Sequence, residues 1–138
     1  VDDLISKVRR EMYQLREPSL ESVQEKLADA AAQICGDRLS RVEIAEFDIE
    51  PALGAQITAI ATELLRNSVR HSGGSEIEIL LSQVENHTYL EVRDNGEGGA
   101  TLESSRLGLI GIKERTETLG GVFSCRSDSS GTRVAITL

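Results

Sequence analysis

Three polar residues in the stretch "ELLRNSVRH", Glu63, Asn67 and Arg70, have the types and the spacing to do chemistry together. Their positions i, i+4 and i+7 place them on one side of a helix, with His71 at its edge. A carboxamide oxygen suits Mg²⁺, a carboxylate can orient or deprotonate a nucleophile, and a guanidinium can meet an anion. A solvated helix face is the competing interpretation. Asn67 weighs against it, because asparagine is a poor helix former in mid-helix.

A second candidate, "RDNGEGG" at residues 93–99, leaves three interpretations open. Asn-Gly is a strong hairpin signal, but a hairpin needs a strand next, and the polar stretch 97–107 follows instead. A calcium loop would need alternating oxygen ligands and a final bidentate glutamate, which are missing. A nucleotide pocket is the third interpretation, because Gly108 and Gly111 open a predicted helix whose N–H groups could meet phosphate oxygens. The absence of GxxxxGK[ST] excludes a Walker-type phosphate loop.

Hydrophobic periodicity predicts the elements that must position these residues. Helical spacing indicates helices over 4–15, from an N-cap at Ser19 to about Gly36, from about Ala52 to Ser72 with a stop at Gly73 and Gly74, and over 108–121. Alternation and turn residues indicate strands over 41–47, 76–84, 88–94, 122–127 and 132–138. This order predicts an α/β two-layer sandwich in which a mixed, mostly antiparallel sheet packs on helices.

Length and composition exclude several classes of protein. The chain has 138 residues, 39% of them hydrophobic, which suits one domain. A net charge of -8 argues against a nucleic-acid binder and against a basic module that contacts a membrane directly. No signal peptide and no apolar run of about 20 residues is present. Cys35 and Cys125, far apart, are interpreted as free thiols of a cytoplasmic protein. The start at Val1 hints at a fragment.

Four motifs in order, "ELLRNSVRH", "DNGEG", "GLIGIKER" and "GTRVAITL", resemble the ATP-binding catalytic domain of sensor histidine kinases. That domain belongs to the GHKL ATPase superfamily and has the Bergerat fold. The resemblance covers about residues 19–138, and the "GLxGxxER" form resembles kinases that pair with NarL-type response regulators. It implies that residues 1–17 are the C-terminal remnant of the dimerisation helices and that residues 18–138 form the ATP-binding domain.

The resemblance also implies roles for the first motif, the N box. Glu63 matches the acidic catalytic residue that positions or activates groups at the γ-phosphate. Asn67 matches the asparagine that coordinates Mg²⁺, and Arg70 and His71 match the basic pair that follows it.

In the later motifs, Asp94 matches the aspartate that binds the exocyclic amine of adenine. The other ATP-binding positions implied are Gly96, Gly98, Gly108, Gly111, Lys113 and Thr132. The first two glycines would let the backbone approach the base, and the next two would hinge a lid and bring amides near the phosphates. Lys113 would add charge, with a solvated helix position as its alternative. Thr132 would support the adenine site, often through water.

The implied activity is transfer of the γ-phosphoryl group of Mg-ATP to a histidine on a dimerisation helix absent from this chain, for relay to the response regulator. Because neither His71 nor His87 lies in an acceptor context, the chain alone is not expected to autophosphorylate. The parent protein is expected to be a homodimer, with a membrane anchor left open. Two alternatives remain: an anti-sigma-factor-type GHKL serine kinase, and an ATP-binding interaction module without turnover.

Overall fold

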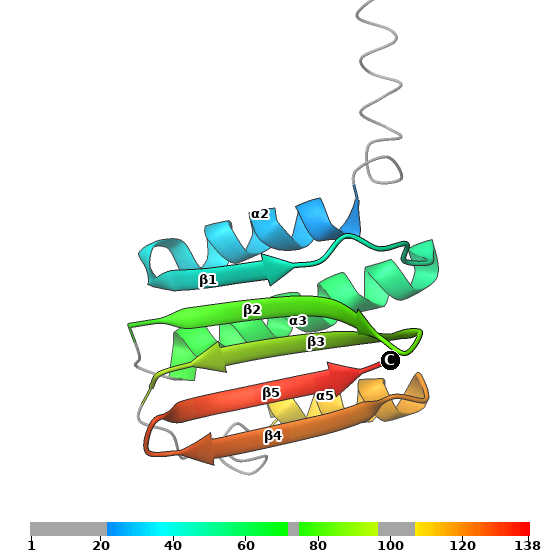
Figure 1. Ribbon diagram of the computed structural model, residues 1–138. Helices are drawn as coiled ribbons and strands as arrows, with labels where there is room; N and C mark the ends of the chain where they lie inside the picture. The colour runs from blue at the N-terminus through cyan, green and yellow to red at the C-terminus, as the bar shows by residue number, and fades with distance from the viewer. Residues whose placement is uncertain (1–21, 72–74, 97–106) are drawn as a thin grey trace, which may run out of the picture.

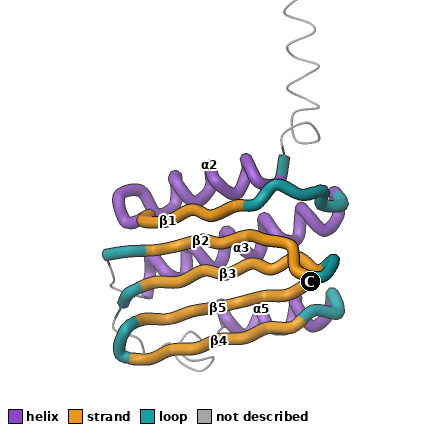
Figure 2. The backbone as a smooth tube through the Cα atoms, viewed as in Figure 1, coloured by secondary structure: helices purple, strands orange, loops and turns teal. Residues whose placement is uncertain are grey.

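The structure is a computed structural model that describes residues 22–71, 75–96 and 107–138. The elements follow one another as α2 (Val23–Cys35), the 3-10 turn η1 (Gly36–Arg38), β1 (Leu39–Ile44), α3 (Pro51–His71), β2 (Ile77–Val84), β3 (His87–Asp94), α5 (Leu107–Thr118), β4 (Val122–Asp128) and β5 (Gly131–Thr137). The strands form one five-stranded sheet in the order β1-β2-β3-β5-β4. All three helices lie on one face of it, as Figures 1 and 2 show.

The sheet is mixed. β1 runs parallel to β2, and every other neighbouring pair is antiparallel. A sheet of this kind packed on helices confirms the predicted fold class. Its second face carries no helix in the described part of the chain (Figure 1).

The core lies between the helices and the sheet. Its members are aliphatic, as expected for a chain with 3% aromatic residues. The largest fully buried side chains are Leu27, Ile57, Ile60, Leu64, Leu65, Ile77, Ile79, Leu81, Leu90, Leu109, Ile136 and Thr116. On β3 and β5, the core-facing residues alternate with residues that face away from the helices. This alternation decides which polar side chains can reach a site on the helix side.

Helix α2 begins later than its predicted N-cap. Ser22, not Ser19, caps it, because the Ser22 hydroxyl accepts the backbone N–H of Glu25 at 3.0 Å. Ser19 lies outside the described residues. The buried Gln24 amide donates to the carbonyls of Phe47 at 2.8 Å and Ala45 at 3.3 Å, which fastens α2 to the chain after β1.

The same contacts explain why β1 is displaced from its predicted range of 41–47. The Gln24 side chain donates hydrogen bonds to the carbonyls of Ala45 and Phe47, so the pairing of β1 with β2 ends at Ile44. The other elements follow the prediction closely. Helix α3 begins at Pro51 and ends at His71, against an expected span of about 52–72.

The β2–β3 hairpin turns at Glu85 and Asn86, which both have positive φ angles, 50° and 67°. Such a two-residue turn matches the twist of the paired strands. The hairpin fixes the register that pairs Ile77 with Asp94 at the other end of the two strands.

Several predictions fall outside the described residues: the helix over 4–15, the boundary between residues 17 and 18, the stop at Gly73 and Gly74, and Gly98. Among the residues that are described, no helix is long and apolar enough to cross a membrane.

Candidate functional site

One end of the molecule gathers the chain segments that carry the predicted site. There β3 ends, β5 begins and α3 ends, while α5 runs from its start at Leu107 toward the opposite end (Figure 1). Register places Asp94 between Ile77 on β2 and Thr132 on β5. The end of α3, Asp94 and Thr132, which are separated in sequence, therefore lie at the same end of the molecule.

Asp94 lies on the helix-facing side of the sheet. It continues the alternation of the buried residues Leu90 and Val92, whereas Arg93 faces the other way. One carboxylate oxygen, Oδ1, accepts the backbone N–H of Gly96 at 3.0 Å. This bond fixes the carboxylate at the point where β3 ends. Gly96 is itself buried.

Thr132 lies beside Asp94 on the same side of the sheet. Its hydroxyl is 3.1 Å from the hydroxyl of Ser127 on β4. Ser127 was not predicted as a site residue. Its only signal in the sequence is its alternation with Cys125 along β4, which places both on the same face of the sheet. Together the three side chains place a carboxylate and two hydroxyls on three adjacent strands, β3, β5 and β4.

Gly131 allows β5 to start close to Asp94. Its φ is 139°, and a Cβ atom there would lie 1.8 Å from the carbonyl oxygen of Asp94. Any side chain would have to push the end of β3 aside. The need for glycine at position 131 was not predicted, because it arises from strand pairing rather than from the local sequence.

Asn95 has a structural role that the sequence analysis did not predict. Its side-chain oxygen accepts the backbone N–H of Glu76 at 2.8 Å, and its amide nitrogen lies 3.3 Å from the Ser75 hydroxyl. Asparagine commonly bonds backbone groups in this way. The contact ties the end of β3 to the start of β2, which holds Asp94 in place.

Cys125 is a half-buried thiol on the helix-facing side of β4. Burial raises its pKa, and the nearby negative charge of Asp94 raises it further. Cys35 is buried in the core, where burial raises its pKa against a smaller lowering effect of Arg38. Both cysteines are free, as predicted.

Helix α3 presents the N-box residues beside its buried face. Ile57, Ala61, Leu64 and Leu65 form that buried face, and Ser68 and Val69 next to them are half-buried. Glu63 and Asn67 are half-buried, and Arg70 is exposed. The Glu63 carboxylate lies 3.4 Å from the guanidinium of Arg66, a long ion pair between two side chains that are each about half exposed.

The Asn67 side chain makes no hydrogen bond to another residue in the described part of the chain, so its oxygen is available to a ligand. Arg38 donates from Nη1 to the carbonyl of Val69 at 3.0 Å, which holds the last turns of α3 against η1. His71 ends the helix, and its side chain lies outside the description.

Helix α5 carries the second glycine box. Gly108 lies in its first turn. Gly111 is exposed, and a Cβ atom there would meet no other atom within 4 Å, so packing does not require glycine at this position. Lys113 pairs with Glu117 at 3.2 Å, one helical turn along. Lys113 is thus bonded within its own helix in this structure.

The described residues contain no group of three or more His, Cys, Asp or Glu side chains that could hold a metal ion. A single carboxamide such as that of Asn67 nevertheless suits Mg²⁺, which is commonly held by few protein ligands together with phosphate oxygens and water.

Comparison with known proteins assigns the family. Residues 53–138 match the family of histidine kinase-, DNA gyrase B- and HSP90-like ATPases. The chain belongs to this family of ATPases, and ATP is therefore the nucleotide that it binds.

The curated relatives are sensor proteins. The chain is 30% identical over 97 residues to the sensor protein VraS of Staphylococcus epidermidis, and 31% identical over 98 residues to VraS of Staphylococcus aureus. Each alignment covers 68% of this chain and 28% of the relative. The chain thus spans little more than a quarter of their length.

Solved structures of histidine kinases share the fold. The histidine kinase domain of the blue-light activated kinase EL346 from Erythrobacter litoralis superimposes with a TM-score of 0.73 at 18% identity, covering 84% of this chain and 64% of that one. The histidine kinase AdeS of Acinetobacter baumannii gives a TM-score of 0.62 at 20% identity, covering 86% of this chain and 61% of that chain.

Proposed function

We propose that the chain is the catalytic ATP-binding domain of a sensor histidine kinase, with adenine bound at Asp94 and the phosphates directed toward α3 and α5. The observation that supports this most strongly is the placement of Asp94 and Thr132 side by side on the helix-facing surface, at the end of the sheet where α3 ends. In this arrangement the Asp94 oxygen that is not bonded to Gly96 accepts from the adenine amine.

Thr132, supported by Ser127, orients water or the base beside Asp94. Gly96 and Gly98 allow close approach of the base, and Gly108 and Gly111 supply backbone N–H groups near the phosphates. Arg70, with His71 as the basic residue that follows it, would bind the same phosphates, and Lys113 would join them by leaving its ion pair with Glu117.

Asn67 would hold Mg²⁺ through its side-chain oxygen. The ion would supply neutralisation of charge on the β- and γ-phosphates. Glu63 is the proposed catalytic residue, which orients the attacking group at the γ-phosphate. The chain's own task is positioning, because phosphoryl transfer leaves little covalent chemistry to the protein.

The acceptor in this proposal is a histidine on a dimerisation helix of the parent kinase, with residues 1–17 as the end of that helical segment and residues 18–138 as the ATP-binding domain. A homodimeric parent would then pass the phosphoryl group to a response regulator of the NarL type. The sensor relatives support the general pairing of kinase and regulator.

The adenine assignment is tested by titrating a fluorescent ATP analogue in the presence of Mg²⁺. Asp94→Asn should weaken binding by about 10-fold or more. Asparagine lacks the negative charge of the carboxylate, and its NH2 group is a second donor facing the donor amine of adenine. Asp128→Asn, the same change at an exposed turn bonded to Ser130, should leave the affinity within about 2-fold. Equal affinities for Asp94→Asn and the unaltered chain would refute the assignment.

The transfer step is tested by mixing the chain with a separately produced acceptor helix and radiolabelled ATP. Acid-labile phosphate on the helix is expected. Glu63→Gln should reduce transfer by at least about 10-fold with nucleotide affinity largely kept. ATP binding without any acid-labile product would favour the interaction module, and phosphate on a supplied sigma-factor antagonist would favour the serine kinase.

A further inference from the structure

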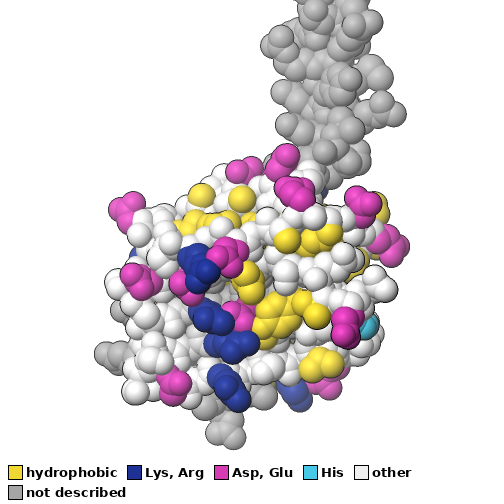
Figure 3. Space-filling view, in the orientation of Figure 1, with side chains coloured by type: hydrophobic (Ala, Val, Ile, Leu, Met, Phe, Trp, Pro, Cys, Tyr) yellow, Lys and Arg dark blue, Asp and Glu magenta, His cyan; other side chains and the backbone are white. Residues whose placement is uncertain are grey.

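The sheet face away from the helices carries a row of arginines that the nucleotide site does not use. Strand register places five charged residues side by side across the sheet. In order they are Arg41 on β1, Glu78 on β2, Arg93 on β3, Arg133 on β5 and Arg126 on β4. We call these five residues the arginine row. Figure 3 shows basic side chains gathered in a column across this face, beside a hydrophobic patch.

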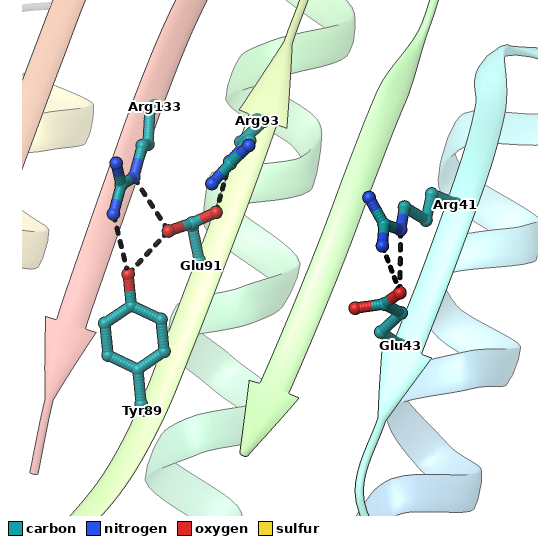
Figure 4. A network of polar contacts seen from close by, with 6 residues as sticks. All are labelled: Arg41, Glu43, Tyr89, Glu91, Arg93 and Arg133. Carbon is teal, nitrogen blue, oxygen red and sulfur yellow. Dashed lines mark hydrogen bonds and ion pairs between the residues drawn. The ribbon is translucent and has the colours of Figure 1, made fainter. Parts of the chain in front are cut away.

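A buried glutamate holds the centre of the row. Glu91 Oε1 accepts from Nε of Arg133 at 2.7 Å and from the Tyr89 hydroxyl at 2.5 Å, while Oε2 accepts from Nε of Arg93 (Figure 4). Arg133 also donates to the Tyr89 oxygen at 3.1 Å. The two guanidinium groups are therefore fixed in place before any ligand arrives.

The charges at this centre do not cancel. Only 3% of the Glu91 side chain is exposed. Burial raises its pKa, but the hydrogen bonds from Tyr89 and Arg93 and the charges of the two arginines outweigh it, so the pKa is lowered and Glu91 stays ionised. One carboxylate thus faces two guanidinium groups. These remain 48% and 44% exposed, and each keeps terminal N–H groups without a partner among the described residues.

Three hollows follow the row. One of about 370 Å³ borders Arg93, Arg133 and Arg126 together with the acidic residues Glu76, Glu78 and Asp128, and at the end of the sheet it also reaches Asp94, Gly131 and Thr132 of the nucleotide site. Another, of about 310 Å³, shares Arg126 and Arg133 with it, and a third, of about 170 Å³, shares Glu78 and Arg93 with it and extends to Arg41. Neighbouring hollows share lining residues and together border all five strands, and we refer to the three hollows as the groove.

The spacing of the row suits a helix. Adjacent strands lie about 4.8 Å apart, so five strands spread the row over about 19 Å. One helical turn rises about 5.4 Å, so about 15 residues of helix, spanning about 22 Å, present five side chains at one per turn, close to one for each strand. An extended peptide, whose same-face residues lie about 6.8 Å apart, matches the strand spacing less well.

We propose that the arginine row is a docking surface for an acidic helix of a partner protein. From β1 to β4 the row reads positive, negative, positive, positive, positive, and Arg41 at its start is already bonded to Glu43 on the same strand. The complementary helix carries acidic residues opposite the four arginines and a basic residue opposite Glu78, and this order gives the surface its specificity. The charge match is local, because the chain as a whole carries -8.

The test is fluorescence anisotropy with two labelled synthetic helical peptides. The first has side chains in the order acidic, basic, acidic, acidic, acidic, one per turn, and the second has the same composition in another order. The first should bind at least about 3-fold more tightly, and its affinity should fall as salt rises. Arg126→Glu should weaken it at least about 5-fold. Arg126 lies outside the Glu91 hydrogen bonds, so this change leaves the buried network intact.

Arg115→Glu, the same change on the exposed surface of α5, is the matched control and should alter affinity less than about 2-fold. Equal weakening by both variants would overturn the proposal, as would equal binding of the two peptides or no saturable binding at low salt. An Arg126-dependent dimer in sedimentation would also overturn it, in favour of a second copy of this chain on the groove. Circular dichroism confirms that each variant is folded.

Discussion

Gly131 shows how one residue can determine the geometry of the adenine site. Gly131→Ala should lower the free energy of unfolding by about 2 kcal/mol or more, because the new methyl group collides with the Asp94 carbonyl in addition to the cost of a positive φ. Urea denaturation measures the loss, and nucleotide titration should show weaker binding.

Gly120→Ala is the matched control for that change. Its φ is 80°, but a Cβ atom there meets nothing within 4 Å, so the loss should be only about 1 kcal/mol. Similar losses for the two variants would mean that the approach of β5 to Asp94 is not a constraint.

Glu91 should make the stability of the fold sensitive to acid. Its pKa is lower in the folded chain than its ordinary value of 4.5, so its contribution is present above about pH 4.5 and is lost as the pH falls through the folded pKa. Glu91→Gln should cost about 1–3 kcal/mol at pH 7 and flatten the dependence of unfolding free energy on pH below about pH 4.5.

Asp128→Asn is a useful comparison, because the pKa of exposed Asp128 is also lowered, by hydrogen bonds from Ser130. An exposed group of this kind should change the stability at pH 7 far less than Glu91. Parallel pH profiles for the unaltered chain and Glu91→Gln would contradict the role assigned to the buried carboxylate.

The reactivity of the Cys125 thiol can show whether the nucleotide site is occupied. Its pKa is raised above the ordinary 9.0, so alkylation by iodoacetamide should be slow at pH 7 and should accelerate as the pH rises past that value. Because Cys125 lies on the helix-facing side near Asp94, bound ATP should slow the reaction several-fold. Rates unaffected by ATP would place the base elsewhere.

At the scale of elements, the β2–β3 hairpin offers a way to stabilise the sheet. Glu85 has a φ of 50°, a region that asparagine tolerates better than glutamate. Glu85→Asn should raise the free energy of unfolding by a few tenths of a kcal/mol up to about 1 kcal/mol. Glu85→Val, which disfavours that φ, should lower it, and chemical denaturation compares the two.

Much of this arrangement could be predicted from sequence because its signals are local. Periodicity located α3 within a residue at each end, and the alternation of β3 and β5 was clear from Leu90, Val92, Val134 and Ile136. The start of α2 and the end of β1 were missed. Ser22 and Gln24 decide them through contacts that spacing does not reveal.

The arginine row could not be predicted, because its members are far apart in the chain and only strand register aligns them. Burial of Glu91 on a face without a helix also contradicts simple alternation. It depends on two arginines and a tyrosine from β3 and β5 that cover the carboxylate. The roles of the N-box residues stay predictions that the nucleotide experiments address.

At the scale of the whole molecule, helices and sheet share one core cluster, which contains Leu27 and Cys35 of α2, Leu64 of α3 and Leu109 of α5. We therefore expect a single cooperative unfolding transition. Loss of helical circular dichroism and exposure of the Cys35 thiol should coincide in urea. Leu64→Ala should shift both midpoints together, at a cost of about 2–5 kcal/mol. Separate midpoints would indicate that α2 unfolds independently.

Alternation along strand β3 directs Arg93 and Asp94, neighbours in the chain, to opposite faces of the sheet. The two proposed binding surfaces therefore lie on opposite faces of the same strand. If a helix bound on one side alters the affinity for ATP on the other, thermodynamic reciprocity requires ATP to alter the affinity for that helix by the same factor. A nucleotide titration repeated with and without the acidic peptide would measure that coupling, and the docking partner would then sense whether the domain is loaded.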